Sequence, residues 1–379
     1  MNIKVVTIVV SAIVLRVILS VISFHPDLAH FVAASKIMSN GQILNFYDQS
    51  SPEQLFNYPP AIYLLDGFYG FLLKPFTENI GWLLKLGYLP FDLILGLSLM
   101  RFFSSQKQKI LSLSLWLFNP INLYTTYLMG QFDVIPTMFV VLSLLLFIKG
   151  KELWGGLSLG MGVAFKIFPI FLLIPFVLQV NSWLKRLVLV ILILGPYIIG
   201  NLIYFSSEGF RSSALMASQS LKSFYASIPV SGGQSILVFP TLLIVLYGLF
   251  YYHKIDVRYL WKRGLVILSL FFIFTHTHPQ WLIWLTPFLI IDLVESNFKQ
   301  SLIIVGVLLT WLGSLFFFDP SLTVGIFSPI ISGPERTLSI WEQLGVSVDY
   351  NFSRSLLHSV FSGLVMLLII IHVKPVKPN

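Results

Sequence analysis

Hydrophobic residues fall into long blocks along this chain, and short polar breaks separate the blocks. Ten blocks predict transmembrane helices, since roughly 20 apolar residues in a helix cross the hydrocarbon core of a bilayer. They are residues 4–24, 82–103, 110–128, 133–148, 187–205, 234–252, 264–276, 280–294, 301–318 and 353–373. Two stretches are ambiguous: 58–73 starts with two prolines, and 153–180 is interrupted by Lys166 and two prolines.

Positive charges decide between the possible topologies. If 58–73 lies along the outer surface and 153–180 crosses twice, fifteen of the 24 Lys and Arg residues face one side and seven face the other. The positive-inside rule makes the fifteen-cation side cytoplasmic. A single crossing by either stretch would translocate the basic segment 253–263, which the rule disfavours. We therefore expect about twelve transmembrane helices, both termini in the cytoplasm, and a juxtamembrane helix in the first outer loop, 25–81.

Composition supports a membrane protein and excludes a soluble enzyme. Of the 379 residues, 56% are hydrophobic and only 11% are charged, against about 25% charged in soluble domains. The net charge of +8 is typical of cytoplasmic anchoring residues, so no nucleic-acid partner is expected. The basic N-terminus lacks a cleavage site and predicts a retained first helix. The fold class is all-α: one polytopic domain over 1–379, with a last outer loop at 319–352.

Polar outliers collect on the predicted outer side. The two halves of 153–180 each reach only roughly 20 Å at 1.5 Å per residue. Their shared turn should therefore lie below the outer membrane surface, where irregular backbone must line a cavity or be buried in protein. The outer segments are HPDLAH (25–30), MGQFD (129–133), FKIFP (165–169), THTHPQ (275–280) and the loops 206–233 and 319–352. An active site is expected where they meet.

Asp27 is the leading candidate for a general base. It follows the first predicted span within one turn and stands between His25 and His30. A carboxylate at a low-dielectric boundary has its pKa raised towards useful basicity. The alternative is that Asp27 caps the helix that follows, because Asp is a preferred N-cap residue.

Lysine and arginine side chains within the apolar blocks need partners. Arg16 and Asp92 lie at similar depths, so we expect them to pair. Lys166 lies beyond Gln131 and Asp133 on the outer side, where it could neutralise a phosphate. The alternatives are a Lys166–Asp133 ion pair or a lysine whose ammonium reaches the interface.

The histidines and arginines of the later outer segments are further candidates. His276 and His278 could hold a phosphate, or could simply be polar residues at a helix end; a metal site lacks further ligands nearby. Arg336 and Arg354 are weaker phosphate candidates. Tyr58 opens the Tyr-Pro-Pro motif, which also suits the start of a helix.

Several ordered motifs resemble integral-membrane glycosyltransferases of the GT-C superfamily. The first outer loop carries D-L-x-x-F at Asp27–Phe31, then Gly41, Phe46-Tyr47 and Tyr58-Pro59-Pro60. The section NPINLYTTYLMGQFD to FKIFP is similar to the middle of that superfamily, and HPQWLIWLTPFL is similar to its later outer motif. The closest resemblance is to bacterial relatives of glycosylphosphatidylinositol mannosyltransferases and of glucosyltransferases that use dolichyl-phosphate-glucose.

The resemblance implies an inverting hexosyltransferase that uses a polyprenyl-phosphate-sugar donor, with mannose or glucose as the sugar. It places the catalytic base at Asp27 and the acceptor on a glycan or lipid-linked sugar outside the plasma (inner) membrane. Some members carry paired acids in the first loop, whereas Asp27 stands alone, so neither a divalent metal nor another cofactor is expected. The donor phosphate would be held by Lys166, His276, His278, Gln280 and Arg336. The acceptor or sugar would be bound by His30, Tyr58, Gln131 and Asp133.

Two other functions remain open from the sequence. A transporter or lipid flippase would also be polytopic with broken helices, but its polar residues should reach both faces. A polymerase or ligase of polyprenyl-linked polysaccharides would also work outside, usually with a larger late outer loop than 319–352.

Overall fold

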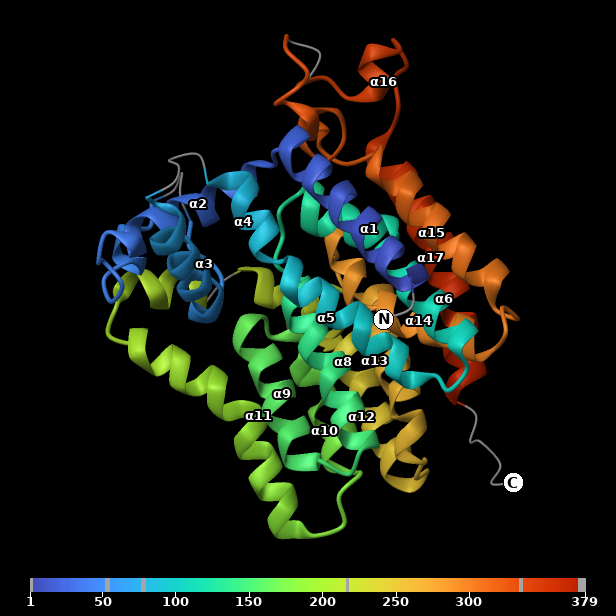
Figure 1. Ribbon diagram of the computed structural model, residues 1–379. Coiled ribbons are helices and arrows are strands. Elements are labelled where there is room, and N and C mark those ends of the chain that lie inside the picture. The colour runs from blue at the N-terminus through green and yellow to red at the C-terminus, as the bar shows by residue number, and fades with distance from the viewer. Residues whose placement is uncertain (1–2, 52–54, 76–79, 216–217, 334–336, 374–379) are drawn as a thin grey trace.

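Helices make up nearly all the regular structure of the chain (Figure 1). The computed structural model describes residues 3–51, 55–75, 80–215, 218–333 and 337–373. The all-α prediction is confirmed, with one small exception. Within these residues two short strands, β1 (Ser227–Ser231) and β2 (Gln234–Leu237), form an antiparallel hairpin.

The first third of the chain contains the juxtamembrane helix that the sequence predicts. Its helices are α1 (Ile3–Ile22), α2 (Pro26–Ser39), η1 (Tyr47–Gln49), α3 (Pro60–Leu73), α4 (Gly81–Gly87), α5 (Leu89–Leu99), η2 (Met100–Phe102) and α6 (Gln106–Leu117). Pro26 and Pro60 begin α2 and α3, at positions where a missing N–H leaves no hydrogen bond unmade. The helix expected at 58–73 is α3, and it packs along α2.

The middle of the chain is more broken than the hydrophobic pattern suggests. Its elements are α7 (Pro120–Asn122), the π-helix η3 (Leu123–Leu128), α8 (Val134–Ile148), α9 (Glu152–Phe165), η4 (Phe168–Leu172), α10 (Leu173–Val177) and α11 (Trp183–Tyr204). The single helix expected over 110–128 is interrupted because Asn119 caps a new helix: its Oδ1 accepts from Ile121 N at 2.9 Å. The break expected within 153–180 is present, since α9 ends at Phe165 and Lys166 is extended.

The last part of the chain carries the hairpin and the longest helix. Its elements are η5 (Phe210–Leu215), η6 (Ser218–Phe224), α12 (Val238–Tyr252), η7 (Val257–Tyr259), α13 (Leu260–Phe274), η8 (Pro279–Trp284), α14 (Thr286–Glu295), α15 (Ser301–Leu315), η9 (Pro320–Leu322), η10 (Val324–Phe327), α16 (Ile340–Gln343) and α17 (Tyr350–Val373). The helix expected from residue 234 begins at Val238, because residues 234–237 pair with β1 instead.

Each of the twelve predicted crossings coincides with a helix or with a run of broken helices. Among the described residues, four segments are long and apolar enough to cross a membrane: Ile3–Ile22, Gly81–Phe102, Trp183–Tyr204 and Tyr350–Val373. The other apolar helices are shorter, and breaks such as the one at Lys166 leave irregular backbone between them. Such backbone is tolerated at membrane depth only beside protein or a cavity.

The buried pair expected between the first two spans is present. Arg16 Nε lies 2.6 Å from Asp92 Oδ2, and both side chains are fully buried. Asp92 also accepts hydrogen bonds from Trp116 Nε1, Asn122 Nδ2 and Tyr127 Oη at 2.6 to 2.9 Å. Because hydrogen bonds reach both carboxylate oxygens, this pair fixes the packing of α1 against α5.

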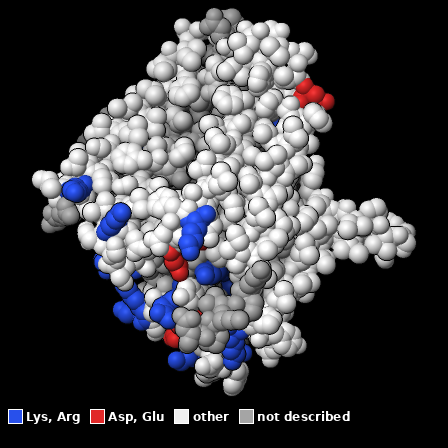
Figure 2. Space-filling view, turned by 90° about the vertical axis from the view of Figure 1, so that its right-hand side faces the viewer, with Lys and Arg blue, Asp and Glu red and all other residues white. Residues whose placement is uncertain are grey.

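The two ends of the molecule differ. In Figure 1, α2, α3 and α16 lie towards the upper end, and the turn from α10 to α11 lies at the lower end. Figure 2 shows Lys and Arg gathered low on one face, below a broad surface with almost no charged side chains. This distribution agrees with the predicted orientation, in which the lower end is cytoplasmic.

Candidate active site

Asp27 lies in the first turn of α2, and the local sequence explains its position. His25, rather than Asp27, is the N-cap of this helix: His25 Nδ1 accepts from the backbone N–H of Asp27 at 3.2 Å. The interpretation of Asp27 as the cap is therefore wrong, and its carboxylate is available for other contacts. Burial lowers the pKa of His25, which keeps Nδ1 unprotonated and able to accept.

Gln131 holds the carboxylate of Asp27. Its Nε2 donates to Asp27 Oδ2 at 2.7 Å, across 104 residues of sequence. The Asp27 side chain is 43% exposed, whereas Gln131 is fully buried. A half-exposed carboxylate with a fixed orientation can accept a proton from a bound hydroxyl group.

Lys166 and Asp133 form the ion pair that the sequence left open. Lys166 Nζ lies 2.7 Å from Asp133 Oδ1, which also accepts from Trp284 Nε1 at 2.5 Å. Asp133 precedes α8 without capping it, so its carboxylate is free to reach Lys166. The ammonium group is already neutralised by this carboxylate, which makes Lys166 a weaker phosphate ligand than an unpaired lysine.

Aromatic rings surround the Lys166 ammonium. Its Nζ lies 5.2 Å from the ring centroids of Tyr58 and Phe132, 5.3 Å from Trp284 and 5.5 Å from Trp281. Cations over ring faces are attracted to them. The Tyr-Pro-Pro motif is therefore joined to the middle outer turn, as the sequence predicts.

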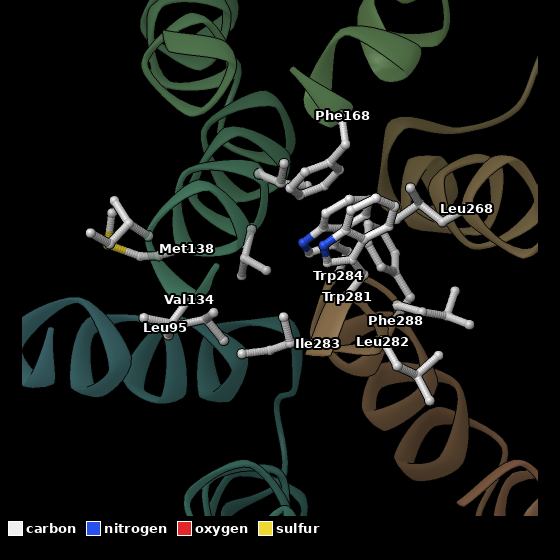
Figure 3. Packing of buried hydrophobic residues seen from close by; sticks show 14 of the residues in the cluster. Leu95, Val134, Met138, Phe168, Leu268, Trp281, Leu282, Ile283, Trp284 and Phe288 are labelled. Atoms are coloured by element: carbon white, nitrogen blue, oxygen red, sulfur yellow. The ribbon is translucent and has the colours of Figure 1, made fainter. Parts of the chain in front are cut away.

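The four rings around Lys166 form an aromatic cage, and a stack of three rings supports it (Figure 3). The rings of Phe168 and Trp284 are nearly parallel, with centroids 4.2 Å apart, and those of Trp284 and Trp281 lie 5.1 Å apart. They come from η4 and η8, which the sequence places more than 100 residues apart. Their packing brings the Lys166 turn and the His276–Gln280 segment together.

Two buried oxygens close to Asp27 lack partners. Within the described part of the chain, Gln131 Oε1 and Asp133 Oδ2 accept no hydrogen bond. An unsatisfied buried polar atom costs about 1–3 kcal/mol, and such atoms are usually reserved for water or a ligand. Sugar hydroxyl groups are donors that would satisfy them.

His276 and His278 lie beside a lysine that the sequence did not single out. Lys222 Nζ is 2.5 Å from His278 Nε2 and 5.3 Å from the ring centroid of Trp281. Burial, and then the charge of Lys222, lowers the pKa of His278 to about 3. The pKa of His276 is lowered for the same two reasons. Both imidazoles are therefore neutral at neutral pH in the unliganded protein.

A cavity of about 670 Å³ opens next to these histidines. Its walls come from the end of α13, from η8 and α15, and from the start of α17. Most of its wall is apolar, and its polar lining residues include His276, His278, Asn351, Arg354, Ser355 and His358.

Arg354 and His358 belong to a polar stripe at the start of α17, of which the sequence analysis names only Arg354. Arg354 Nη2 donates to Asn351 Oδ1 at 2.6 Å, and His358 Nε2 lies 3.0 Å from Ile273 O. Asn351, Arg354, Ser355 and His358 follow helical i, i+3 and i+4 spacing at the start of an apolar helix. That polar stripe could have identified His358, whereas Lys222 has no recognisable motif around it.

A smaller cavity of about 90 Å³ lies against the aromatic cage. Tyr58, Lys166, Trp281 and Trp284 line it, together with Tyr197 from α11. Trp281 borders this cavity, while its neighbours Pro279 and Leu282 border the larger one. The η8 segment thus separates an aromatic chamber from an apolar and basic chamber.

The remaining predicted site residues lie less centrally. His30 is half-buried on α2, one turn beyond Asp27, and is among the lining residues of neither cavity. Gln280 is buried, and its backbone carbonyl accepts from Thr125 Oγ1 at 3.1 Å. Arg336 lies outside the described residues.

Comparison with known proteins identifies the family. The description "Glycosyltransferase family 87" matches residues 56–314. The chain belongs to this family. It is therefore a membrane glycosyltransferase of GT-C type, and the transporter alternative loses its support.

Two further similarities agree with this assignment. GPI mannosyltransferase 1 of Saccharomyces cerevisiae is 28% identical over 136 residues, which are 34% of this chain and 32% of that protein. The chain thus matches about a third of the length of this relative. The structure of ArnT from Cupriavidus metallidurans, bound to undecaprenyl phosphate, superposes with a TM-score of 0.53. It covers 97% of this chain and 76% of that one at 11% identity, so the fold is shared.

Proposed function

We propose that this glycosyltransferase moves a hexose from a polyprenyl-phosphate-sugar to a glycan or lipid-linked acceptor. The reaction takes place on the outer face of the plasma (inner) membrane, and Asp27 acts as the general base. One observation carries the proposal: Gln131 Nε2 donates to the half-exposed carboxylate of Asp27 and fixes its orientation, as a general base requires. The undecaprenyl phosphate in ArnT and the similarity to a mannosyltransferase support this donor class and favour mannose, with glucose as the second choice.

The larger cavity suits the donor. Its apolar wall would take the first isoprene units, and its basic residues would face the phosphate. Arg354 and Lys222 supply positive charge there, and the neutral His276 and His278 can donate hydrogen bonds or take up a proton. Lys166, Gln280 and Arg336 stay predicted phosphate ligands, although the Asp133 ion pair makes Lys166 the weaker one.

The smaller cavity suits the acceptor sugar. Tyr58, Trp281 and Trp284 offer ring faces to the apolar side of a hexose. The unpartnered oxygens of Gln131 and Asp133 lie outside the lining of this cavity and would accept from hydroxyl groups that reach towards Asp27. His30 stays a predicted contact on the same face of α2 as Asp27. Under this proposal the acceptor lies beside the base.

Transfer then requires one proton acceptor and a stabilised leaving group. The acceptor hydroxyl oxygen attacks the anomeric carbon while its proton passes to Asp27. The bond from that carbon to the phosphate oxygen breaks, and polyprenyl phosphate leaves with the bonding electron pair. Attack from the side opposite the phosphate inverts the anomeric configuration. Nearby cations stabilise the charge that grows on the phosphate.

The test is transfer of radiolabelled sugar from polyprenyl-phosphate-hexoses in membranes. Asp27→Asn should lower transfer by about 10²-fold or more, because general base catalysis contributes typically 10²–10⁴-fold, while donor binding persists. Asp256→Asn, the same change at an exposed acid beside Arg258, is the matched control and should retain activity. Equal transfer by wild type and Asp27→Asn would remove Asp27 from the chemistry.

The polymerase or ligase alternative gives a different product. Such an enzyme would transfer a preassembled glycan from a polyprenyl carrier. Supplying membranes with both a labelled monosaccharide donor and a labelled lipid-linked oligosaccharide separates the two. Incorporation from the oligosaccharide alone would overturn the proposed donor.

A further inference from the structure

Lys85 on α4 is fully buried and plays no part in the transfer proposed above. Its Nζ donates to Ser23 O at 2.6 Å, Ser23 Oγ at 3.0 Å, Leu128 O at 3.2 Å and Ser20 O at 3.3 Å. Within the described residues, no carboxylate lies close enough to form an ion pair with it. A buried ionisable residue in a membrane protein is costly and usually functional, so its four oxygen contacts need an explanation.

These oxygens belong to the two segments that deliver Asp27 and Gln131. Ser20 and Ser23 lie at the end of α1, where the last carbonyl groups have no partner within the helix. A cation at this end also interacts favourably with the helix dipole. Leu128 is the last residue of η3. His25, the cap of α2, follows Ser23 by two positions, and Gln131 follows Leu128 by three.

The carbon chain of Lys85 contacts the second segment as well. Gly130 has a φ of +75°, a conformation that glycine adopts without strain. A Cβ added there would meet Lys85 Cγ and Cε at 3.3 Å and Leu28 Cδ1 at 3.0 Å. The turn before Gln131 therefore rests on both Lys85 and α2, and the Asp27–Gln131 hydrogen bond forms where these parts meet.

We propose that Lys85 is a positioning residue that holds Asp27 and Gln131 at bonding distance. Its ammonium ties the end of α1 to the end of η3, so the two segments cannot separate. The inference rests on the proposed role of Asp27 as the base. Lys85 lines neither cavity, so its loss should affect the chemical step rather than donor binding.

The test compares Lys85→Met with a closely matched control, Arg263→Met. Arg263 is also a buried cation that donates to carbonyls at a helix end, those of Phe250 at 3.1 Å and His253 at 2.6 Å after α12. Lys85→Met should lower kcat by about 10²-fold, the loss typical of a misplaced catalytic group, with an unchanged KM for the donor. Arg263→Met should leave both constants near wild type. A Lys85→Met enzyme with wild-type kcat would overturn the proposal.

Hydrogen–deuterium exchange supplies a second measurement that does not depend on activity. Lys85→Met should speed amide exchange in residues 23–31 and 128–133, and Arg263→Met should not. Faster exchange in these two segments would support the positioning role of Lys85. If Asp27→Asn is fully active as well, Asp27 is not the general base. Unchanged exchange in Lys85→Met would refute the positioning role by itself.

A milder substitution covers the case in which Lys85→Met does not fold. Ser23 Oγ accepts from Lys85, and its single hydrogen lies within reach of Leu19 O at 2.5 Å and Tyr127 O at 3.1 Å. Ser23→Ala removes this bridge and keeps the ammonium, so a smaller fall in kcat with unchanged KM is expected. Wild-type kcat and exchange rates in Ser23→Ala would count against the inference.

Discussion

The buried charges of this chain differ in how completely they are partnered. Arg16 and Asp92 form a structural pair: hydrogen bonds reach both carboxylate oxygens of Asp92, and among the described residues only Arg16 Nη2 of this pair lacks a partner. Asp133 keeps one oxygen without a partner, and so does the neighbouring amide of Gln131. A buried oxygen without a partner is an atom that a ligand could satisfy. Such oxygens also occur at Asp66 and Asp292, so the one on Gln131 points to a site only because the same amide holds the carboxylate of Asp27.

His278 predicts how donor binding depends on pH. Its pKa is about 3 in the unliganded protein, and a bound phosphate would favour the imidazolium and raise that pKa. Binding then takes up a proton, so donor affinity should increase as pH falls below the pKa of His278 in the complex and level off near its unliganded pKa of about 3. Calorimetric titration of Asp27→Asn with the donor, in buffers of different ionisation enthalpy, measures the proton uptake directly.

The donor is a phosphodiester, so its own charge does not change over this range. Adding His278→Gln should abolish the uptake, while adding His253→Gln, at the end of α12, should leave it intact. Proton uptake that persists without His278 would assign it to another group, such as His276.

Sequence reasoning could single out Asp27, Gln131, Asp133 and Lys166 because polar side chains are rare in so apolar a chain, and the structure brings them into contact in pairs. It left open whether Lys166 and Asp133 pair, because an ion pair between segments depends on how helices pack. Lys222 was missed for the same reason, since its loop becomes part of the site only by folding over Trp281.

At the scale of the elements, close packing of α2 on α3 supports the segment that carries Asp27. A Cβ at Gly70 on α3 would lie only 2.7 Å from Ser35 O on α2. The hydroxyl of Ser35 donates to Asp66 O at 2.8 Å, which fixes the approach of the two helices. Such contact requires glycine, because even a methyl group would force the helices apart.

Gly70→Ala should therefore destabilise the protein by about 1–3 kcal/mol, the usual cost of overpacking. It should also lower kcat, because α2 shifts with its first turn. Thermal unfolding in detergent and the transfer rate measure the two effects. Gly248→Ala on α12, where no atom lies within 4 Å of the added Cβ, is the control and should not destabilise. Equal stability of the two variants would refute this account.

Helices were predictable at this scale, but their interruptions were not. Every apolar block predicted to cross the membrane contains helical residues, and α3 starts at the paired prolines as expected. The break at Asn119 and the hairpin of β1 and β2 depend on capping and pairing that a hydrophobic pattern does not encode. The break at Lys166 was the exception, because Lys166 and two prolines visibly interrupt the apolar residues of 153–180.

At the scale of the whole molecule, the cationic surface lies at the lower end (Figure 2), whereas α2, which carries Asp27, lies towards the upper end (Figure 1). The proposed donor is a lipid, so the enzyme needs lateral access from the bilayer rather than a nucleotide from the cytoplasm. The apolar cavity between α13, α15 and α17 provides a wall for such a chain. This function requires the site to face outwards.

The orientation is testable because the chain contains no cysteine. Single cysteines at Ser231, Lys107 and Lys254, all exposed, can be labelled in intact cells with a membrane-impermeant maleimide. Ser231→Cys should react from outside, and Lys107→Cys and Lys254→Cys should react only after permeabilisation.

Each position tests a different part of the topology. Labelling of Lys107→Cys from outside would mean that 58–73 crosses the membrane, since this stretch precedes residue 107. If Lys107→Cys is protected but Lys254→Cys is labelled, 153–180 crosses an odd number of times. If Ser231→Cys is protected, the hairpin lies on the cytoplasmic side. The cavity would then lie on that side too, because Tyr225 and Ala226, which directly precede the hairpin, line it. That result would leave the cavity accessible to nucleotide sugars and remove the main argument for a lipid-linked donor.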